Sequence, residues 1–66
     1  MILKNKDKIH FMRREMGLTL KALAEKIEVY YQRIWSWEKG IYSPTLDEYD
    51  RLCALYEEKT GNKRPE

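Results

Sequence analysis

Few side chains in this sequence could carry out covalent or acid–base chemistry. The chain has one histidine, His10, one cysteine, Cys53, and two serines, Ser36 and Ser43. Neither serine lies in the strand-turn-helix context of a hydrolase nucleophile. One histidine and one cysteine cannot supply the four ligands of a structural zinc site without carboxylates. We therefore expect no catalysis, no bound metal and no cofactor, and we interpret Cys53 as a small core residue.

Length and composition favour a single small folded domain. The 66 residues suffice for one domain at most, and 42% hydrophobic with 36% charged residues argues against disorder. The net charge of +2 does not by itself indicate nucleic-acid binding, so such a function depends on where the charges lie. The apolar start Met1-Ile2-Leu3 is too short for a signal peptide or a membrane span. We expect a cytoplasmic protein with no membrane partner.

Apolar residues recur at helical spacing in four segments, which predicts helices over residues 6–16, 20–27, 31–39 and 46–59. Their apolar stripes consist of Ile9, Met12 and Met16 with Arg13 among them, of Leu20, Leu23, Ala24 and Ile27, of Ile34 and Trp37, and of Leu46, Tyr49, Leu52, Cys53 and Tyr56. No segment alternates as a strand would. The sequence therefore predicts an all-α domain over residues 1–61, a compact bundle of four helices with five as the alternative, and a flexible polar tail over residues 62–66.

Local signals mark the ends of these helices. Gly17 and Gly40 follow the first and third segments, where glycine can adopt the left-handed conformation that ends a helix. Thr19 can cap the second segment. Thr45 and Glu48 have the spacing of a capping box at the start of the fourth.

The second and third segments are short and separated by about three residues, as in a helix-turn-helix. Ala24 lies where the two helices would approach most closely. On spacing alone, an ordinary small helical bundle explains the pattern as well as a DNA-binding motif does.

From Ile9 to Leu55 the sequence resembles the Cro/repressor-type helix-turn-helix family, also called the lambda-repressor-like or xenobiotic-response-element family. The elements that carry the resemblance are Ile9-x-x-Met12-Arg13-x-x-x-Gly17-Leu18-Thr19, Leu23-Ala24-Glu25-Lys26-Ile27, Ile34-x-x-Trp37-Glu38-Lys39-Gly40 and Pro44-Thr45-Leu46. Each element alone is weak evidence for the family, but their combined order and spacing are specific to it. The resemblance implies sequence-specific binding of double-stranded DNA by the third helix, commonly as a homodimer on a palindromic operator, without catalysis.

The resemblance also implies which residues would contact DNA. Base contacts would come from the third helix, at Tyr31, Gln32, Arg33 and Ser36. The amide of Gln32 is suited to bonding adenine through two hydrogen bonds. Phosphate contacts would come from the start of the second helix and from the stretch around the end of the third, at Thr19, Lys21, Lys39 and Tyr42. The alternative for all of these residues is an ordinary solvated polar face.

Arg13 lies on the apolar face of the first predicted helix, where an unpaired charge would be costly. In the family that the chain resembles, this arginine pairs with the glutamate that follows the core aromatic of the third helix. The resemblance therefore implies a structural ion pair between Arg13 and Glu38, which fixes the third helix and does not contact DNA.

Three residues depart from the family's pattern. Glu28 occupies the turn position that is usually glycine, so a left-handed backbone there would cost on the order of 1 kcal/mol and the turn could be reshaped. Tyr30 replaces the usual small hydroxyl cap of the third helix. Leu20 replaces a glutamine that often contacts a phosphate, so that contact is expected to be lost.

The stretch from Val29 to Tyr42 is rich in aromatic residues. Trp37 belongs to the predicted core, which leaves Tyr30, Tyr31, Trp35 and Tyr42 as candidates for exposure. On DNA, Tyr30 and Trp35 would contact the backbone or thymine methyl groups. Exposed tyrosine and tryptophan also dominate protein-binding hot spots, and Phe11 could form a second contact surface.

Two hypotheses follow. The first is a transcription regulator of the phage or plasmid repressor type, bacterial and nucleoid-associated, which dimerises at least on DNA through the fourth helix and the tail. The second is a module that binds another regulator through Tyr30, Tyr31 and Trp35.

Overall fold

The computed structural model describes residues 5–65, and these form four α-helices with no strand. They are α1 (Asn5–Met16), α2 (Leu20–Ile27), α3 (Tyr31–Lys39) and α4 (Leu46–Thr60). Each boundary falls within one residue of the range predicted from apolar spacing. The all-α, four-helix fold is confirmed. Residues Met1–Leu3, discussed above for their apolar character, lie outside the described residues.

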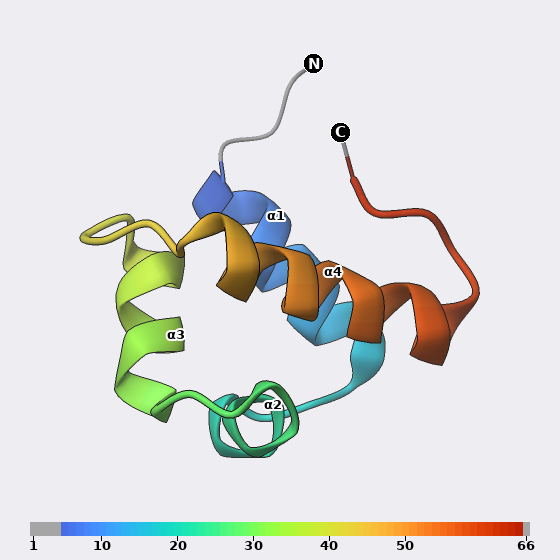
Figure 1. The fold of residues 1–66 in the computed structure, drawn as a ribbon, viewed down its shortest axis with the longest axis horizontal. Helices are drawn as coiled ribbons and strands as arrows, with labels where there is room; N and C mark the ends of the chain where they lie inside the picture. The colour runs from blue at the N-terminus through green and yellow to red at the C-terminus, as the bar shows by residue number, and fades with distance from the viewer. Residues whose placement is uncertain (1–4, 66) are drawn as a thin grey trace.

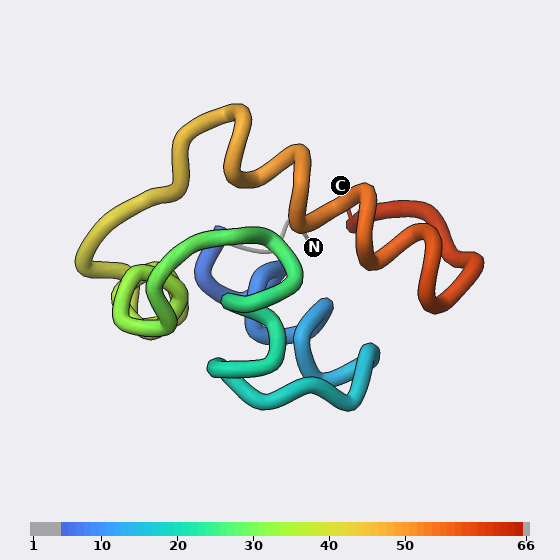
Figure 2. The backbone as a smooth tube through the Cα atoms, turned by 60° about the horizontal axis from the view of Figure 1, so that its bottom comes forward, coloured from blue at the N-terminus to red at the C-terminus, as the bar shows by residue number. Residues whose placement is uncertain are grey.

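The helices pack in a crossed arrangement in which α3 and α4 each contact both α1 and α2. Figure 1 shows α3 along one edge of the molecule, with α4 crossing above α2. The connection from α3 to α4 forms a wide outer arc in Figure 2. α3 therefore has one side on the core and one side on the surface.

The core is built from all four helices. Its buried apolar residues are Ile9, Met12, Leu23, Ala24, Ile27, Ile34, Trp37, Leu52, Cys53 and Tyr56. Every one of them lies on an apolar stripe predicted from the sequence. Met16, Leu20 and Tyr49 are only partly buried against this core.

The prediction that Leu46 points inward is wrong, because this side chain is 91% exposed. Leu46 is the first residue of α4, and the buried residue of that first turn is Glu48. The carboxylate of Glu48 can be buried at little cost because both of its oxygens accept hydrogen bonds.

The predicted caps are present. Thr19 Oγ1 accepts a hydrogen bond from Ala22 N at 3.1 Å at the start of α2. At the start of α4, Thr45 Oγ1 accepts from Glu48 N at 3.1 Å, and Glu48 Oε1 accepts from Thr45 N at 2.9 Å. This reciprocal pair is the predicted capping box.

The turn between α2 and α3 keeps the left-handed residue that the motif requires. Glu28 has φ 59° and ψ 49°, and Val29 N donates to Ala24 O at 3.0 Å to close the turn. The turn is therefore not reshaped by the absence of glycine. Tyr30 precedes α3 in an extended conformation and makes no side-chain capping bond. This agrees with the prediction that tyrosine is a poor N-cap.

Residues 62–65, predicted to form a flexible polar tail, fold back along α4 (Figure 1). Arg64 donates to Glu57 Oε2 through Nε at 3.0 Å, and to Asp50 Oδ1 through Nη1 at 2.9 Å. Glu57 lies about one turn and Asp50 about three turns before the end of α4. Their carboxylates hold the segment against the helix. Glu66 lies outside the described residues. Over residues 5–65, no helix is long and apolar enough to cross a membrane.

Candidate nucleic-acid interface

The surface position of α3 follows from the spacing of its apolar residues. Ile34 and Trp37 are buried and hold the helix against its neighbours. Because a helix turns every 3.6 residues, Tyr31 and Trp35 lie one turn apart on a flank of α3 that points away from Trp37, and both are partly exposed. Gln32 is exposed next to them. The outward side of α3 thus presents an amide and two aromatic rings.

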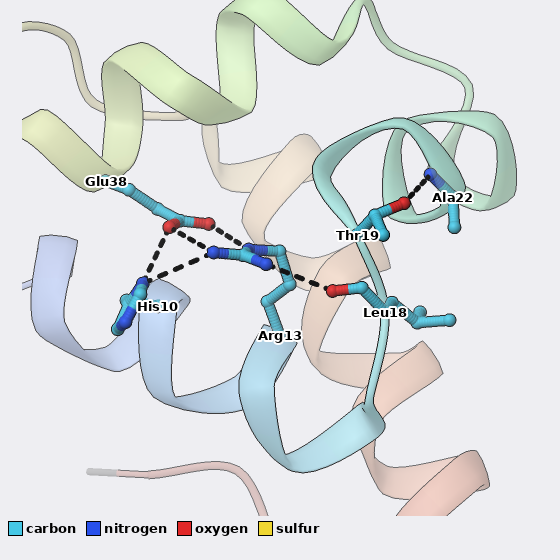
Figure 3. A network of polar contacts seen from close by, with 6 residues as sticks. All are labelled: His10, Arg13, Leu18, Thr19, Ala22 and Glu38. Atoms are coloured by element: carbon cyan, nitrogen blue, oxygen red, sulfur yellow. Dashed lines mark hydrogen bonds and ion pairs between the residues drawn. The ribbon is translucent and has the colours of Figure 1, made fainter.

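An ion-pair network fixes the C-terminal end of α3 to α1 (Figure 3). Arg13 donates to both oxygens of Glu38, through Nε at 2.7 Å and through Nη2 at 3.0 Å. Arg13 Nη1 also donates to Leu18 O at 3.0 Å, which ties the segment before α2 to the same network. The structure thus places Arg13 and Glu38 together, as the resemblance implied.

His10 completes this network, and the sequence offered no signal for it. Its Nδ1 lies 2.8 Å from Glu38 Oε1, although the two residues are 28 positions apart. Burial alone would raise the pKa of Glu38, but the hydrogen bonds from Arg13 and His10 outweigh it, so that this pKa is lowered. Glu38 is therefore held as a carboxylate.

A second pair connects α3 to α4. Arg33 donates to Glu48 Oε2 through Nε at 2.9 Å and to Oε1 through Nη2 at 2.7 Å. The hydrogen bond from Arg33 is the main cause of a lowered pKa at Glu48, with burial opposing it. The same carboxylate caps α4 through Thr45 N. Arg33, expected at bases or phosphates, thus already has a bidentate partner inside the molecule.

Ser36 is placed differently from the expected base contact. The residue is only 8% exposed, and its hydroxyl donates to Arg33 O at 2.7 Å. Of the two neighbouring rings, Trp35 is 46% exposed, whereas Trp37 is buried in the core. A base edge would have to compete with this internal hydrogen bond for the Ser36 hydroxyl.

The remaining predicted contact residues are exposed. Tyr30 is 81% and Tyr42 71% exposed, which is unusual for such large rings. Thr19, Lys21 and Lys39 are also exposed. Thr19 Oγ1 already accepts from Ala22 N, which leaves its proton available for donation.

Two lysines lie close to aromatic rings on this surface. Lys21 Nζ is 5.7 Å from the centre of the Tyr31 ring, and Lys39 Nζ is 6.0 Å from that of Trp35. These are cation–π distances. The two ammonium groups come from α2 and from the last turn of α3, so that each exposed ring of α3 has a cation beside it.

A hollow of about 610 Å³ lies beside α3 and the connection that follows it. We call it the α3 hollow, and its lining residues are Tyr31, Gln32, Arg33, Trp35, Ser36, Trp37, Ile41 and Tyr42. None of them is acidic. Ile41, which is 56% exposed at its edge, was not singled out from the sequence. Within residues 5–65, no three His, Cys, Asp or Glu side chains gather closely enough to hold a metal ion.

Comparison with known proteins confirms the resemblance seen in the sequence. The family described as "Helix-turn-helix" matches residues 9–61, from the middle of α1 to the residue that ends α4. A protein of Methanothermobacter thermautotrophicus, described as an uncharacterized HTH-type transcriptional regulator, is 53% identical over 34 residues. That match covers 52% of this chain and 49% of the relative. No solved structure matches the chain.

Proposed function

Because the chain belongs to the helix-turn-helix family, we propose that it is a transcription regulator that binds double-stranded DNA through α3. The observation that carries the proposal is the placement of α3. Its inner side is locked by Ile34, Trp37 and the Glu38 network, while its outer side is free and bordered by lysines. A rigidly held, exposed second helix is the element that such motifs insert into the major groove.

Tyr31 and Gln32 would contact base edges, with Gln32 bonding adenine through its amide. Lys21, Lys39 and Thr19 would contact phosphates, together with Tyr30, Trp35 and Tyr42. Arg33 would act on DNA only through the hydrogen-bonding capacity that Glu48 leaves free. The negatively charged backbone of DNA is complementary to the exposed lysines at both ends of the contact surface.

We propose further that the protein is a small repressor of the phage or plasmid type, which acts by occluding a promoter. It binds a palindromic operator as a homodimer formed on DNA, with α4 and the tail as the contact between copies. Leu46, exposed at the start of α4, supports that surface. Such a regulator acts in the cytoplasm, and in a bacterial cell it is associated with the nucleoid. It uses no cofactor and catalyses no reaction.

The test is selection of bound sequences from a random duplex pool, followed by fluorescence anisotropy from low to physiological salt. A short enriched motif with two symmetric half-sites is expected, and the affinity should fall steeply with salt. Replacing Lys21 or Lys39 with alanine should reduce the slope of log K against log salt by about 0.9 for each lost phosphate contact. Lys26→Ala, an exposed lysine at the end of α2 that has no predicted phosphate contact, is the matched control and should leave the slope unchanged.

Base reading is tested at Gln32. Gln32→Ala should lower discrimination at one position of the motif by about 1–3 kcal/mol. Glu25→Ala, an exposed position on α2, serves as the control. A random-pool selection that enriches no motif, even at low salt, would contradict the proposed function.

A second candidate is a module that binds another protein through Tyr30, Tyr31 and Trp35. The strong exposure of Tyr30 favours it, since such rings are typical of protein-binding hot spots. Under this function Tyr31→Ala and Trp35→Ala abolish partner binding, whereas Gln32→Ala has little effect. Pull-down and duplex binding measured on the same three variants separate the two functions.

A further inference from the structure

We propose that duplex DNA binding is coupled to the uptake of a proton at His10, because a backbone phosphate approaches this imidazole at a cleft between α1 and α3. The inference rests on the proposed function, since it names a regulation of the same DNA contact. Histidine is the side chain whose ordinary change of charge falls between about pH 5 and pH 8, and this chain has one histidine.

The hydrogen bond to Glu38 determines which nitrogen of His10 can take up a proton. Glu38 is held as a carboxylate, which can only accept, so Nδ1 carries a hydrogen and donates across 2.8 Å to Glu38 Oε1. In the neutral ring Nε2 is then the basic nitrogen, and it lies on the side of the ring away from Glu38 (Figure 3). The side chain of His10 is 50% exposed, so solvent can deliver a proton to Nε2.

His10 lines a cleft of about 420 Å³ that we call the α1–α3 cleft. The residues that line it are Lys6, Asp7, His10, Arg13, Leu20, Trp35, Glu38 and Lys39. Two of them, Trp35 and Lys39, are also among the proposed phosphate contacts, and the ammonium group of Lys39 lies 6.0 Å from the centre of the Trp35 ring. A phosphate bound by Lys39 would therefore lie at the same cleft as the imidazole.

Charged groups of both signs surround His10, and they come from two helices. They are Lys6, Asp7, Arg13 and, one turn further along, Arg14 on α1, and Glu38 and Lys39 on α3. From α2 only the apolar Leu20 reaches the cleft. The carboxylates favour the protonated ring and the cations oppose it. A DNA phosphate adds a negative charge to this set, which favours the imidazolium form in the complex.

Thermodynamic linkage gives the direction of the effect. If bound DNA favours protonated His10, then protonated His10 favours bound DNA by the same free energy, so the affinity for DNA rises as the pH falls. The coupling should lie at the low end of the usual range, because the imidazole is half exposed to solvent. We expect the affinity to increase about five- to tenfold from about pH 8 to about pH 5.5.

The experiment uses the unmodified protein and the duplex selected from the random pool. Anisotropy at fixed salt gives the dissociation constant across this pH range. Nuclear magnetic resonance follows the imidazole directly, because all histidine signals belong to His10. These signals should titrate at higher pH with the duplex than without it. Calorimetry in two buffers of different ionisation enthalpy should report uptake of a fraction of one proton per chain near neutral pH.

A variant assigns the pH dependence to His10. His10→Gln keeps an amide that can donate to Glu38 but cannot take up a proton, so the ratio of the dissociation constants at high and low pH should move toward one. Glu15→Gln changes an exposed carboxylate of α1 that does not line the cleft, and this control should keep the full ratio. Circular dichroism verifies that both variants are folded at each pH.

The outcomes separate the two levels of inference. A selected duplex that is bound with the same affinity at high and low pH overturns the proton inference alone. A pH dependence that persists in His10→Gln also overturns it, because the proton would then bind at another group. Absence of duplex binding at every pH, even at low salt, overturns the proposed function and this inference with it.

Discussion

Replacing Glu38 with glutamine should destabilise the domain by about 2–3 kcal/mol. Glu38 accepts three short hydrogen bonds, two from Arg13 and one from His10. Removing one partner from a fully buried ion pair costs about 3–5 kcal/mol. We expect less than this, because the Arg13 side chain retains 16% exposure and a glutamine oxygen can still accept one bond.

This loss is large for a chain of 66 residues, whose total stability should be roughly 3–10 kcal/mol. The melting temperature should fall by about 10–20 °C. Urea unfolding followed by circular dichroism at pH 7 measures the change. Asp47→Asn is the control, since it breaks a 3.5 Å pair with Arg51 in which Asp47 is 84% exposed. That change should cost less than about 0.5 kcal/mol.

Equal stability of the Glu38→Gln and Asp47→Asn variants would refute the reasoning. It would mean that the network at the end of α3 contributes no more than a surface ion pair. The stiffness of α3, on which the proposed reading of DNA depends, would then need another source.

Three further predictions concern stability and reactivity. The pKa values of Glu38 and Glu48 are lowered in the folded protein, so near these pKa values the folded state binds fewer protons than the unfolded chain. The urea midpoint should therefore be constant above the unfolded pKa of about 4.3 and fall as the pH drops below it. A midpoint that rises on acidification would contradict the assignment. Glu28→Gly should raise the free energy of unfolding by about 0.5–1 kcal/mol in the same urea assay, because the left-handed φ of 59° strains every residue except glycine; a loss of stability would show that the turn is not left-handed in solution. Cys53 is fully buried and burial raises its pKa, so a colourimetric thiol reagent should label it only at the rate of unfolding; rapid labelling of the native protein would place this residue outside the core.

The helix boundaries could be predicted because their signals lie within one turn of the chain. Thr45 and Glu48 satisfy each other's backbone amides across three residues, and the chain on either side has no influence on that exchange. Gly40 ends α3 with φ 77°, a conformation that its lack of a side chain permits. The apolar stripes of α1, α2 and α3 likewise depend only on helical spacing.

Apart from Arg13 and Glu38, which the family resemblance paired, the sequence could not reveal which polar groups meet once the helices cross. His10 and Glu38 are 28 positions apart, and Arg33 and Glu48 are 15 apart, so each contact depends on the angle between two helices. The internal hydrogen-bond partners of Arg33 and Ser36, two predicted DNA contacts, could not be foreseen for this reason.

Sequence alone thus determined the four helices, which follow from short-range spacing. It also indicated the helix-turn-helix family, through the resemblance carried by the ordered elements between Ile9 and Leu55. Tertiary structure decided that Glu48 replaces Leu46 on the inner side of the first turn of α4, and that Ile41 meets Trp35 and Tyr42 around one hollow. Burial and concave surfaces arise only when several helices pack together, because a side chain is buried by residues of neighbouring helices and a single helix forms no hollow.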